Sequence, residues 1–116
     1  MNRKIVLVAF NGEGMCFVHV LLNALDMHEK GCEVKLVIEG SATKLVKELA
    51  DSDKPFADLY QTIREKGMID CVCQACASTT GARESAEAQG LTLCSELRGH
   101  PSLIKYREQG YEIMTF

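Results

Sequence analysis

Hydrophobic positions along the chain follow two different periods. Five short runs are continuously apolar or rich in β-branched residues, which is typical of parallel strands buried on both faces. We expect strands over residues 4–9, 34–38, 69–74, 91–94 and 111–116. Between these runs, apolar residues recur every three or four positions, the period of a helix with one buried face. We expect helices over residues 15–30, 42–50, 56–63, 78–89 and 101–109.

Glycine marks the positions where predicted helices give way to strands. The phrases EKGCEV, EKGMID, AQGLTL and EQGYEI each place a glycine between a polar helical tail and a strand-like run. Glycine readily adopts the left-handed conformation that closes a last helical turn. We therefore expect helices to end at Gly31, Gly67, Gly90 and Gly110. At helix starts, Ser41 is a candidate N-cap and Pro101 a candidate first-turn residue.

Strands that alternate with helices imply right-handed crossovers and a parallel sheet. We predict an α/β fold: one three-layer α/β/α domain over residues 1–116, with a mostly parallel five-stranded sheet and a flavodoxin-like general layout. A chain of 116 residues that is 47% hydrophobic suffices for one core. Ligands of such sheets gather at the carboxyl ends of the strands. The loops NGEGMC and QACAS both follow strands at that edge, so Cys16 and Cys76 are potential neighbours.

Charge and hydropathy exclude several kinds of partner. Sixteen acidic and thirteen basic side chains leave a formal net charge of -3, and the basic residues are scattered. This gives no electrostatic reason to expect nucleic acid or an anionic membrane as a partner. The apolar run over residues 5–10 is shorter than a signal-peptide core, and no segment approaches the roughly 20 apolar residues of a membrane-spanning helix. We expect a cytoplasmic protein.

Half of the six cysteines lie in the segment IDCVCQACAST, residues 69–79. Their even number allows a disulfide framework, but their fraction is below the roughly 8–10% of short disulfide scaffolds. Clustered cysteines in a reducing compartment more often indicate metal or sulfur chemistry. We expect packing roles for Cys32, Cys71 and Cys94. His100 precedes a proline, and its spacing does not connect it to the cluster.

Cys76 falls between the end of a predicted strand and the first turn of the next helix. Unpaired amides and the positive end of the helix dipole favour a thiolate at such a position. The neighbouring residues are small or hydroxylated, which leaves space around the sulfur. We predict that Cys76 is reactive. Cys73 shares a strand face with Cys71, so both a packing role and a reactive role stay open for it.

The segment VCQACASTTGARESAEAQGL resembles the DsrE-like sulfur-relay family, as do FNGEGMCFVHVLLNAL, VKLVIEGSATKLV and the ending GYEIMTF. The resemblance covers nearly the whole chain. It implies an α/β/α domain that assembles as a homo-oligomer, a trimer or hexamer. It also implies a cysteine that accepts sulfane sulfur from a donor protein as a persulfide and passes it to an acceptor protein, with no cofactor. The family's active cysteine corresponds to Cys76, and Cys73 could share its function.

Residues of the first predicted helix extend this hypothesis. Cys16 could be a second sulfur site or a resolving thiol, and His19, one turn later, could tune its protonation. The helix is apolar on most of its surface, and any part that the sheet leaves uncovered would form a subunit interface. The residues concerned are Phe17, Val18, Val20, Leu21, Leu22 and Leu25.

Three alternatives compete with the sulfur carrier. Cys73 and Cys76 form a C-x-x-C motif, which suggests dithiol redox chemistry, although neither proline, Pro55 or Pro101, stands where a thioredoxin-like site has its cis-proline. Zinc is a stronger alternative, with Cys16 and His19 completing a tetrahedral ligand set. A binding or assembly module is the third, because Gly12-Glu13-Gly14 could present amides to an anion. That loop lacks the third glycine of a dinucleotide fingerprint, and Glu13 would repel phosphate.

Overall fold

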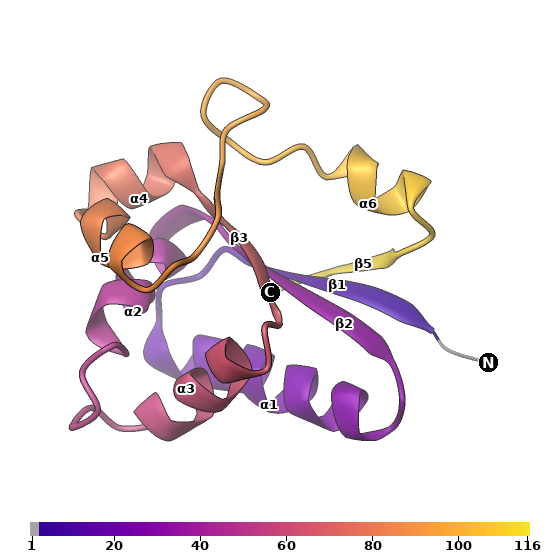
Figure 1. Cartoon of the computed structure of the whole chain (residues 1–116), viewed down its shortest axis with the longest axis horizontal. Coiled ribbons are helices and arrows are strands. Elements are labelled where there is room, and N and C mark those ends of the chain that lie inside the picture. Colours follow the sequence, from indigo (N-terminus) through magenta and orange to yellow (C-terminus); the bar gives the residue numbers. More distant parts are fainter. Residues whose placement is uncertain (1–2) are drawn as a thin grey trace.

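Five parallel strands form one sheet, and helices cover both of its faces (Figure 1). The computed structural model describes residues 3–116. The strands are β1 (Lys4–Ala9), β2 (Glu33–Ile38), β3 (Ile69–Cys73), β4 (Leu93–Cys94) and β5 (Glu112–Thr115). The helices are α1 (Gly14–Glu29), the 3-10 helix η1 (Gly40–Ala42), α2 (Thr43–Glu48), α3 (Ala57–Glu65), α4 (Gln74–Thr80), α5 (Arg83–Ala88) and α6 (Ile104–Glu108).

The strand order β4-β3-β2-β1-β5 explains how the helices are divided between the two faces. The first four strands are added in one direction, so right-handed crossovers place α1 to α5 on the same face. After β4 the chain returns past β1 to the other edge, which places α6 on the opposite face (Figure 1). The predicted α/β fold with a five-stranded parallel sheet is therefore confirmed.

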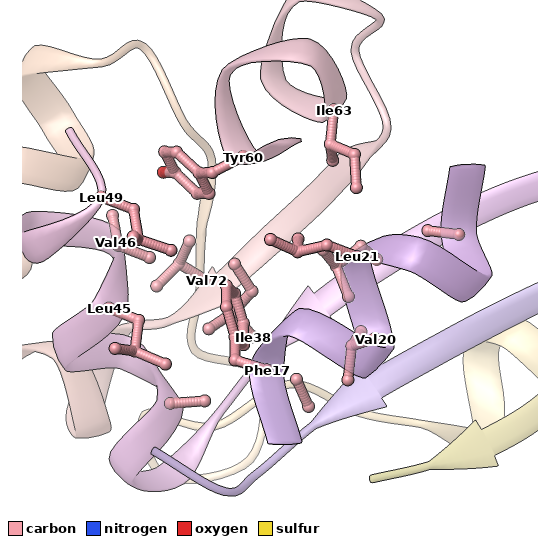
Figure 2. Packing of buried hydrophobic residues seen from close by; sticks show 14 of the residues in the cluster. Phe17, Val20, Leu21, Ile38, Leu45, Val46, Leu49, Tyr60, Ile63 and Val72 are labelled. Carbon is pink, nitrogen blue, oxygen red and sulfur yellow. The ribbon is translucent and has the colours of Figure 1, made fainter. Parts of the chain in front are cut away.

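Alternate residues of the central strands supply two separate cores. On β1, Ile5 and Leu7 point towards α1, whereas Val6 and Val8 point towards α6. The larger core contains Phe17 of α1, Tyr60 of α3 and many aliphatic side chains from the sheet (Figure 2). The two-residue period of each strand thus buries apolar side chains on both faces, as the continuous apolar runs in the sequence predict.

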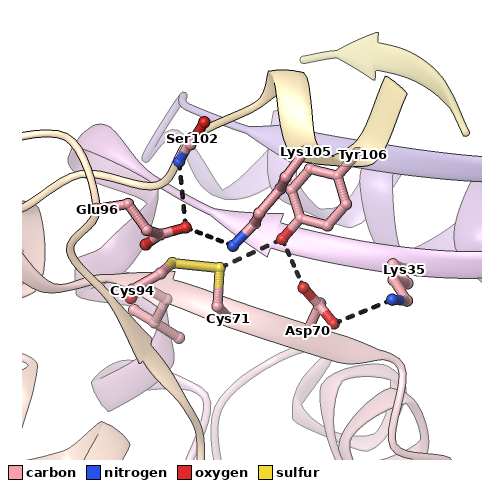
Figure 3. Close-up of polar contacts among 9 residues, drawn as sticks. Lys35, Asp70, Cys71, Cys94, Glu96, Ser102, Lys105 and Tyr106 are labelled. Carbon is pink, nitrogen blue, oxygen red and sulfur yellow. Dashed lines mark hydrogen bonds and ion pairs between the residues drawn. A yellow bond between two sulfur atoms is a disulfide. The ribbon is translucent and has the colours of Figure 1, made fainter. Parts of the chain in front are cut away.

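A disulfide and a polar network lie beneath α6, on the face of the sheet that this helix covers (Figure 3). Cys71 of β3 and Cys94 of β4 are bonded, with their Cα atoms 5.8 Å apart. Buried Tyr106 of α6 donates a hydrogen bond to Asp70 Oδ2 (2.5 Å), and its oxygen lies 3.6 Å from Cys71 Sγ. Lys35 Nζ lies 3.6 Å from Asp70 Oδ1. Burial raises the pKa of the Tyr106 phenol, which therefore stays a donor.

The disulfide corrects the expectation that Cys71 and Cys94 are only packing residues. Both are buried as predicted, but adjacent parallel strands bring two side chains of the same face within the Cα separation that a disulfide spans, about 4.4–6.8 Å. Their separation of 23 positions in the sequence shows nothing of this proximity. Strand pairing therefore decides which cysteines are crosslinked.

Several predicted helix boundaries are wrong for identifiable reasons. Gly81, with a φ of +79°, ends α4, so the helix predicted over residues 78–89 is two helices. The Ser41 hydroxyl accepts a hydrogen bond from the Gly12 N–H (2.8 Å) and does not cap α2. Pro101 precedes α6, which begins at Ile104. The four glycines predicted to end helices all have a positive φ and follow helices, as expected.

The apolar surface of α1 is mostly covered within one chain. Phe17, Val18, Val20 and Leu21 are buried, and Leu25 packs against the core. Leu22 is 48% exposed, and one exposed leucine is ordinary on a monomer. Met15 of α1, two turns earlier on the same helix face, is 59% exposed, so the subunit interface and the oligomer stay predictions. Within residues 3–116, no helix has the length and apolar content needed to cross a membrane.

Replacing Cys71 and Cys94 together by alanine should lower the free energy of unfolding by about 2–4 kcal/mol, because the disulfide restricts the unfolded chain. Denaturant unfolding under non-reducing conditions measures this loss. Cys32→Ala, at a half-buried free cysteine, is the matched control and should have a small effect. Reductant should destabilise the native protein and leave the double variant unchanged. Equal stability of the native protein with and without reductant would contradict the crosslink.

Candidate functional site

Two cysteines and a histidine meet at the carboxyl end of β3. Cys73 is the last residue of β3 and the N-cap of α4, and its side chain is buried. Cys76 lies in the first turn of α4 and is half-buried. His100 belongs to the loop that follows β4. Its Nδ1 atom lies 3.0 Å from Cys73 Sγ and 3.7 Å from Cys76 Sγ.

A tight turn of residues 97–100 presents the imidazole. Leu97 and His100 exchange two backbone hydrogen bonds, of 2.8 and 2.9 Å. The two central residues, Arg98 and Gly99, have φ values of +49° and +92°, which defines a type I′ turn. This turn places the His100 side chain beside the start of α4.

Gly99 also ties this turn to α4. Its carbonyl accepts a hydrogen bond from the Ala75 N–H (2.9 Å), one of the helix-start amides that otherwise lack partners. A Cβ atom at Gly99 would lie 2.9 Å from the Ala75 Cβ, closer than two such atoms can approach. The absence of a side chain at Gly99 thus allows the contact that brings His100 to the cysteines.

A cavity of about 390 Å³ opens over Cys76. The side chains around it are small or hydroxylated, apart from the imidazole and the thiol. Its lining comes from the loop after β2, from α4 and from the histidine turn: Gly40, Ser41, Ala75, Cys76, Thr79, Thr80 and His100. The cavity gives Cys76 the room that its small neighbours in the sequence predict.

The buried Cys73 is held as a thiol. Burial, together with the neighbouring Cys76 side chain, raises the pKa of Cys73 to about 11, although the Cys76 backbone N–H lowers it in part. The Gly99 carbonyl accepts a weak hydrogen bond from the thiol, with 3.6 Å between sulfur and oxygen. A hydrogen bond to the neutral form adds to the preference for the thiol. Cys73 and Cys76 therefore share a motif but not an environment.

Glu39 adds a buried carboxyl group at the same edge of the sheet. It follows β2 directly, is 7% exposed, and lies on the strand face of Val37, whose partner in β3 is Cys71. Burial raises the pKa of Glu39, and the nearby His100 opposes this shift. The carboxyl group also acts on Cys73, since its charge disfavours a second negative charge there.

The structure brings only part of the predicted site together. Within residues 3–116, the cluster of ligating atoms within 4.8 Å of one another contains Cys73, Cys76 and His100, without Cys16 or His19. The four-ligand zinc set of the sequence prediction is therefore wrong. The catalytic functions assigned to Cys76, Cys73 and Cys16 stay predictions.

Cys16 is exposed at the start of α1 and belongs to a different environment. Its backbone N–H donates a hydrogen bond to the Glu13 carboxylate (3.1 Å), which caps the helix. The same carboxylate raises the pKa of the Cys16 thiol, because it accepts a hydrogen bond from the thiol and repels a thiolate. This environment lowers the fraction of thiolate, the form in which a second sulfur site or a resolving thiol reacts.

Sequence reasoning missed two residues of the site. The spacing of His100 from the cysteines carries no signal in the sequence, and only the pairing of β3 with β4 brings it near them. Glu39 did carry a signal, since it is a polar residue directly after a buried strand in VKLVIEG. Like the loops after the first and third strands, Glu39 follows the carboxyl end of a parallel strand, where functional sites of such sheets gather.

Comparison with known proteins identifies the family of this parallel α/β domain, which carries Cys73 and Cys76 at the carboxyl end of β3. The model of the DsrE/DsrF-like family matches residues 1–116, so the chain belongs to that family. This membership indicates sulfur relay at the coarse level of the family.

The relatives that match this chain carry names that state no activity. An uncharacterized protein of Methanocaldococcus jannaschii, MJ0733, is 36% identical over 97 residues, which cover 84% of this chain and 77% of the relative. An uncharacterized protein of Archaeoglobus fulgidus is 42% identical over 43 residues, 37% of this chain and 70% of the relative. A solved structure, the conserved protein of unknown function BT1422 from Bacteroides thetaiotaomicron, has a TM-score of 0.68 at 19% identity, covering 97% of this chain and 94% of its own. That likeness confirms the fold.

Gly99→Ala should destabilise the protein by about 1–3 kcal/mol more than Gly31→Ala, because only the former creates a steric clash. The two glycines have nearly equal φ values, +92° and +89°, but a Cβ at Gly31 would meet nothing within 4 Å. Denaturant unfolding gives the difference. The Gly99 variant should also expose Cys73 to alkylation at neutral pH, measured by mass spectrometry. Equal stabilities and equal alkylation would contradict the proposed contact with Ala75.

Proposed function

We propose that the protein is a cysteine sulfur carrier that holds sulfane sulfur as a persulfide on Cys76. The observation that carries the proposal is the position of Cys76 Sγ, half-buried in a cavity of about 390 Å³ and 3.7 Å from an imidazole nitrogen. Membership of the DsrE/DsrF-like family supports sulfur relay as the general process. The small and hydroxylated lining leaves space for one additional sulfur atom.

Two exchange reactions load and unload the carrier. In the first, the Cys76 thiolate attacks the outer sulfur of a donor persulfide, a new S–S bond forms, and the donor cysteine leaves as a thiolate. In the second, an acceptor thiolate attacks the outer sulfur of the Cys76 persulfide, and Cys76 returns to its thiolate form. Each reaction breaks one S–S bond and forms another, so no external oxidant or reductant is needed.

His100 supports both reactions by facing the reacting sulfur. When its Nδ1 atom carries a proton, it can donate a hydrogen bond to the Cys76 thiolate or to the persulfide anion. His100 is exposed and lines the cavity, so its ring lies beside the sulfur that reacts. We therefore assign it the stabilisation of the anionic sulfur.

Cys73 protects the cargo by remaining protonated. A Cys73 thiolate could attack the inner sulfur of the Cys76 persulfide, which would form a Cys73–Cys76 disulfide and release hydrosulfide. The pKa of about 11 keeps Cys73 almost entirely in the thiol form near neutral pH, and the thiol is a poor nucleophile. Burial of Cys73 thus suppresses the discharge that the C-x-x-C spacing would otherwise permit.

The proposal includes the partners and the assembly. The sulfur donor and the acceptor are proteins whose reactive cysteines reach Cys76 through the mouth of the cavity. The chain acts as a homo-oligomer, a trimer or hexamer, in the cytoplasm, in keeping with the family that the sequence resembles. The net charge of -3 disfavours nucleic acid as a further partner.

Incubation with a low-molecular-weight persulfide donor should add the mass of one sulfur atom per chain, located on Cys76. Intact mass spectrometry after removal of the donor detects the cargo, and peptide mapping locates it. Cys76→Ser should abolish the addition, whereas Cys32→Ser, the matched control at another free cysteine, should leave it unchanged. His100→Ala should slow loading by about tenfold or more, the lower range of a charge-assisted hydrogen bond. An unaltered mass of the native protein, or sulfur retained by Cys76→Ser, would refute the assignment.

Hydrosulfide release from the loaded protein should rise as the pH increases from neutral towards 11, because the Cys73 thiolate then becomes populated. A sulfide-selective electrode measures the rate. Cys73→Ala is the control, since it removes the attacking thiol and should keep the rate low over the same pH range. An equal rise in the variant would show that the cargo hydrolyses without help from Cys73.

A further inference from the structure

We propose that Cys73, Cys76 and His100 also form a three-ligand zinc(II) site, whose fourth position opens into the cavity. The site is independent of the persulfide chemistry. Its consequence, that zinc and sulfur cargo exclude each other, rests on the proposed function because both need Cys76 Sγ.

The distances suit an ion of the size of zinc. With Zn–S bonds of about 2.3 Å and Zn–N bonds of about 2.0–2.1 Å, a tetrahedral site separates sulfur from nitrogen by about 3.5 Å and two sulfurs by about 3.8 Å. His100 Nδ1 lies 3.0 Å from Cys73 Sγ and 3.7 Å from Cys76 Sγ. All three atoms lie within 4.8 Å of one another. Small shifts of the three ligating side chains would therefore accommodate the ion.

The chemistry of the ligands also selects zinc. Two thiolates and one imidazole form a set of borderline softness, which suits zinc and disfavours magnesium or calcium, whose ligands are oxygens. Each thiol would lose its proton to solvent when the metal binds, and the imidazole would bind in its neutral form. The two thiolates would then balance the charge of the ion, so that the buried Cys73 sulfur would no longer carry an isolated negative charge.

The backbone already holds these ligands in place. Cys73 ends a central strand and Cys76 begins the following helix, so their separation is set by the start of α4. The hydrogen bond from the Ala75 N–H to the Gly99 carbonyl positions the histidine turn over them. Ligands that are placed before the metal arrives lose little conformational freedom when they bind it.

The site keeps one coordination position free. No fourth His, Cys, Asp or Glu joins the three ligating atoms anywhere in residues 3–116. Structural zinc sites are closed by four protein ligands, whereas three-ligand sites hold an exchangeable water or thiol. Here the cavity beside Cys76 supplies room for that fourth ligand. Zinc at this position would bind the Cys76 sulfur, which must attack the donor persulfide. The metal would therefore prevent loading of the carrier until it is removed.

Titration of the metal-free protein, with its Cys71–Cys94 disulfide intact, with Zn²⁺ against a chromogenic chelator tests the site without any sulfur donor. We expect one zinc per chain. His100→Ala should weaken binding by about 100-fold or more, since loss of outer ligand contacts alone costs about 10–100-fold. Because His100 is exposed, this variant leaves the core intact. Cys32→Ser is the matched control and should bind like the native protein. Cobalt(II) should give the absorption bands of tetrahedral thiolate ligation, which His100→Ala should alter.

Each outcome separates the zinc site from the sulfur carrier. Zinc binding that is unaffected by His100→Ala, or that is lost in Cys32→Ser, would overturn the site. Preloading with one equivalent of Zn²⁺ should prevent persulfide formation, and a chelator should restore it. If sulfur loads on Cys76 but zinc does not bind, the zinc site is wrong and the carrier stands. If zinc binds through the three residues but no sulfur loads, the carrier is wrong and the metal site stands.

Discussion

The hydrogen bond from the Ala75 N–H to the Gly99 carbonyl is the interaction on which the site depends. It joins the first turn of α4 to the turn of residues 97–100, two segments that are distant in the sequence but follow adjacent strands, β3 and β4. The contact requires that Gly99 have no side chain, because the Ala75 Cβ occupies the space that a Cβ would fill. Without this contact, the edge of the sheet would hold two cysteines and no imidazole. With it, His100 faces both sulfurs, and both sulfur chemistry and metal binding become possible.

The part of the fold that depends on local pattern could be predicted, and the part that depends on strand pairing could not. Continuous apolar runs identify the strands because both faces of β1 and β2 are buried. The rule that sites gather at carboxyl ends also finds Cys76. His100 stayed hidden because β4 is only two residues long, and nothing local shows that it pairs with β3. The disulfide between Cys71 and Cys94 was missed for the same reason. Gly81 was missed because a glycine within a run of small residues gives no contrast in hydrophobicity.

Burial makes the two cysteines of the C-x-x-C motif chemically different. Cys73 ends a strand whose residues are covered on both faces, so its ionised form is costly and its pKa rises to about 11. Cys76 is one helical turn further along, at the edge of a cavity. A carrier needs this asymmetry, because two equally ionised thiols at such a distance would exchange the cargo for a disulfide. A motif that is read as symmetric in the sequence is therefore asymmetric in the structure.

The thiol form of Cys73 also preserves the neighbouring disulfide. Cys73 is the register partner of Cys94 across β3 and β4, and Cys94 is bonded to Cys71 on the same face of the sheet. A thiolate at Cys73 would therefore lie next to a disulfide on one side and next to the persulfide of Cys76 on the other, and could attack either. Burial, together with the charge of Glu39, disfavours that thiolate. One physical effect, the cost of an ionised sulfur at the buried end of β3, thus keeps the crosslink at the sheet edge separate from the exchange chemistry proposed for the cavity.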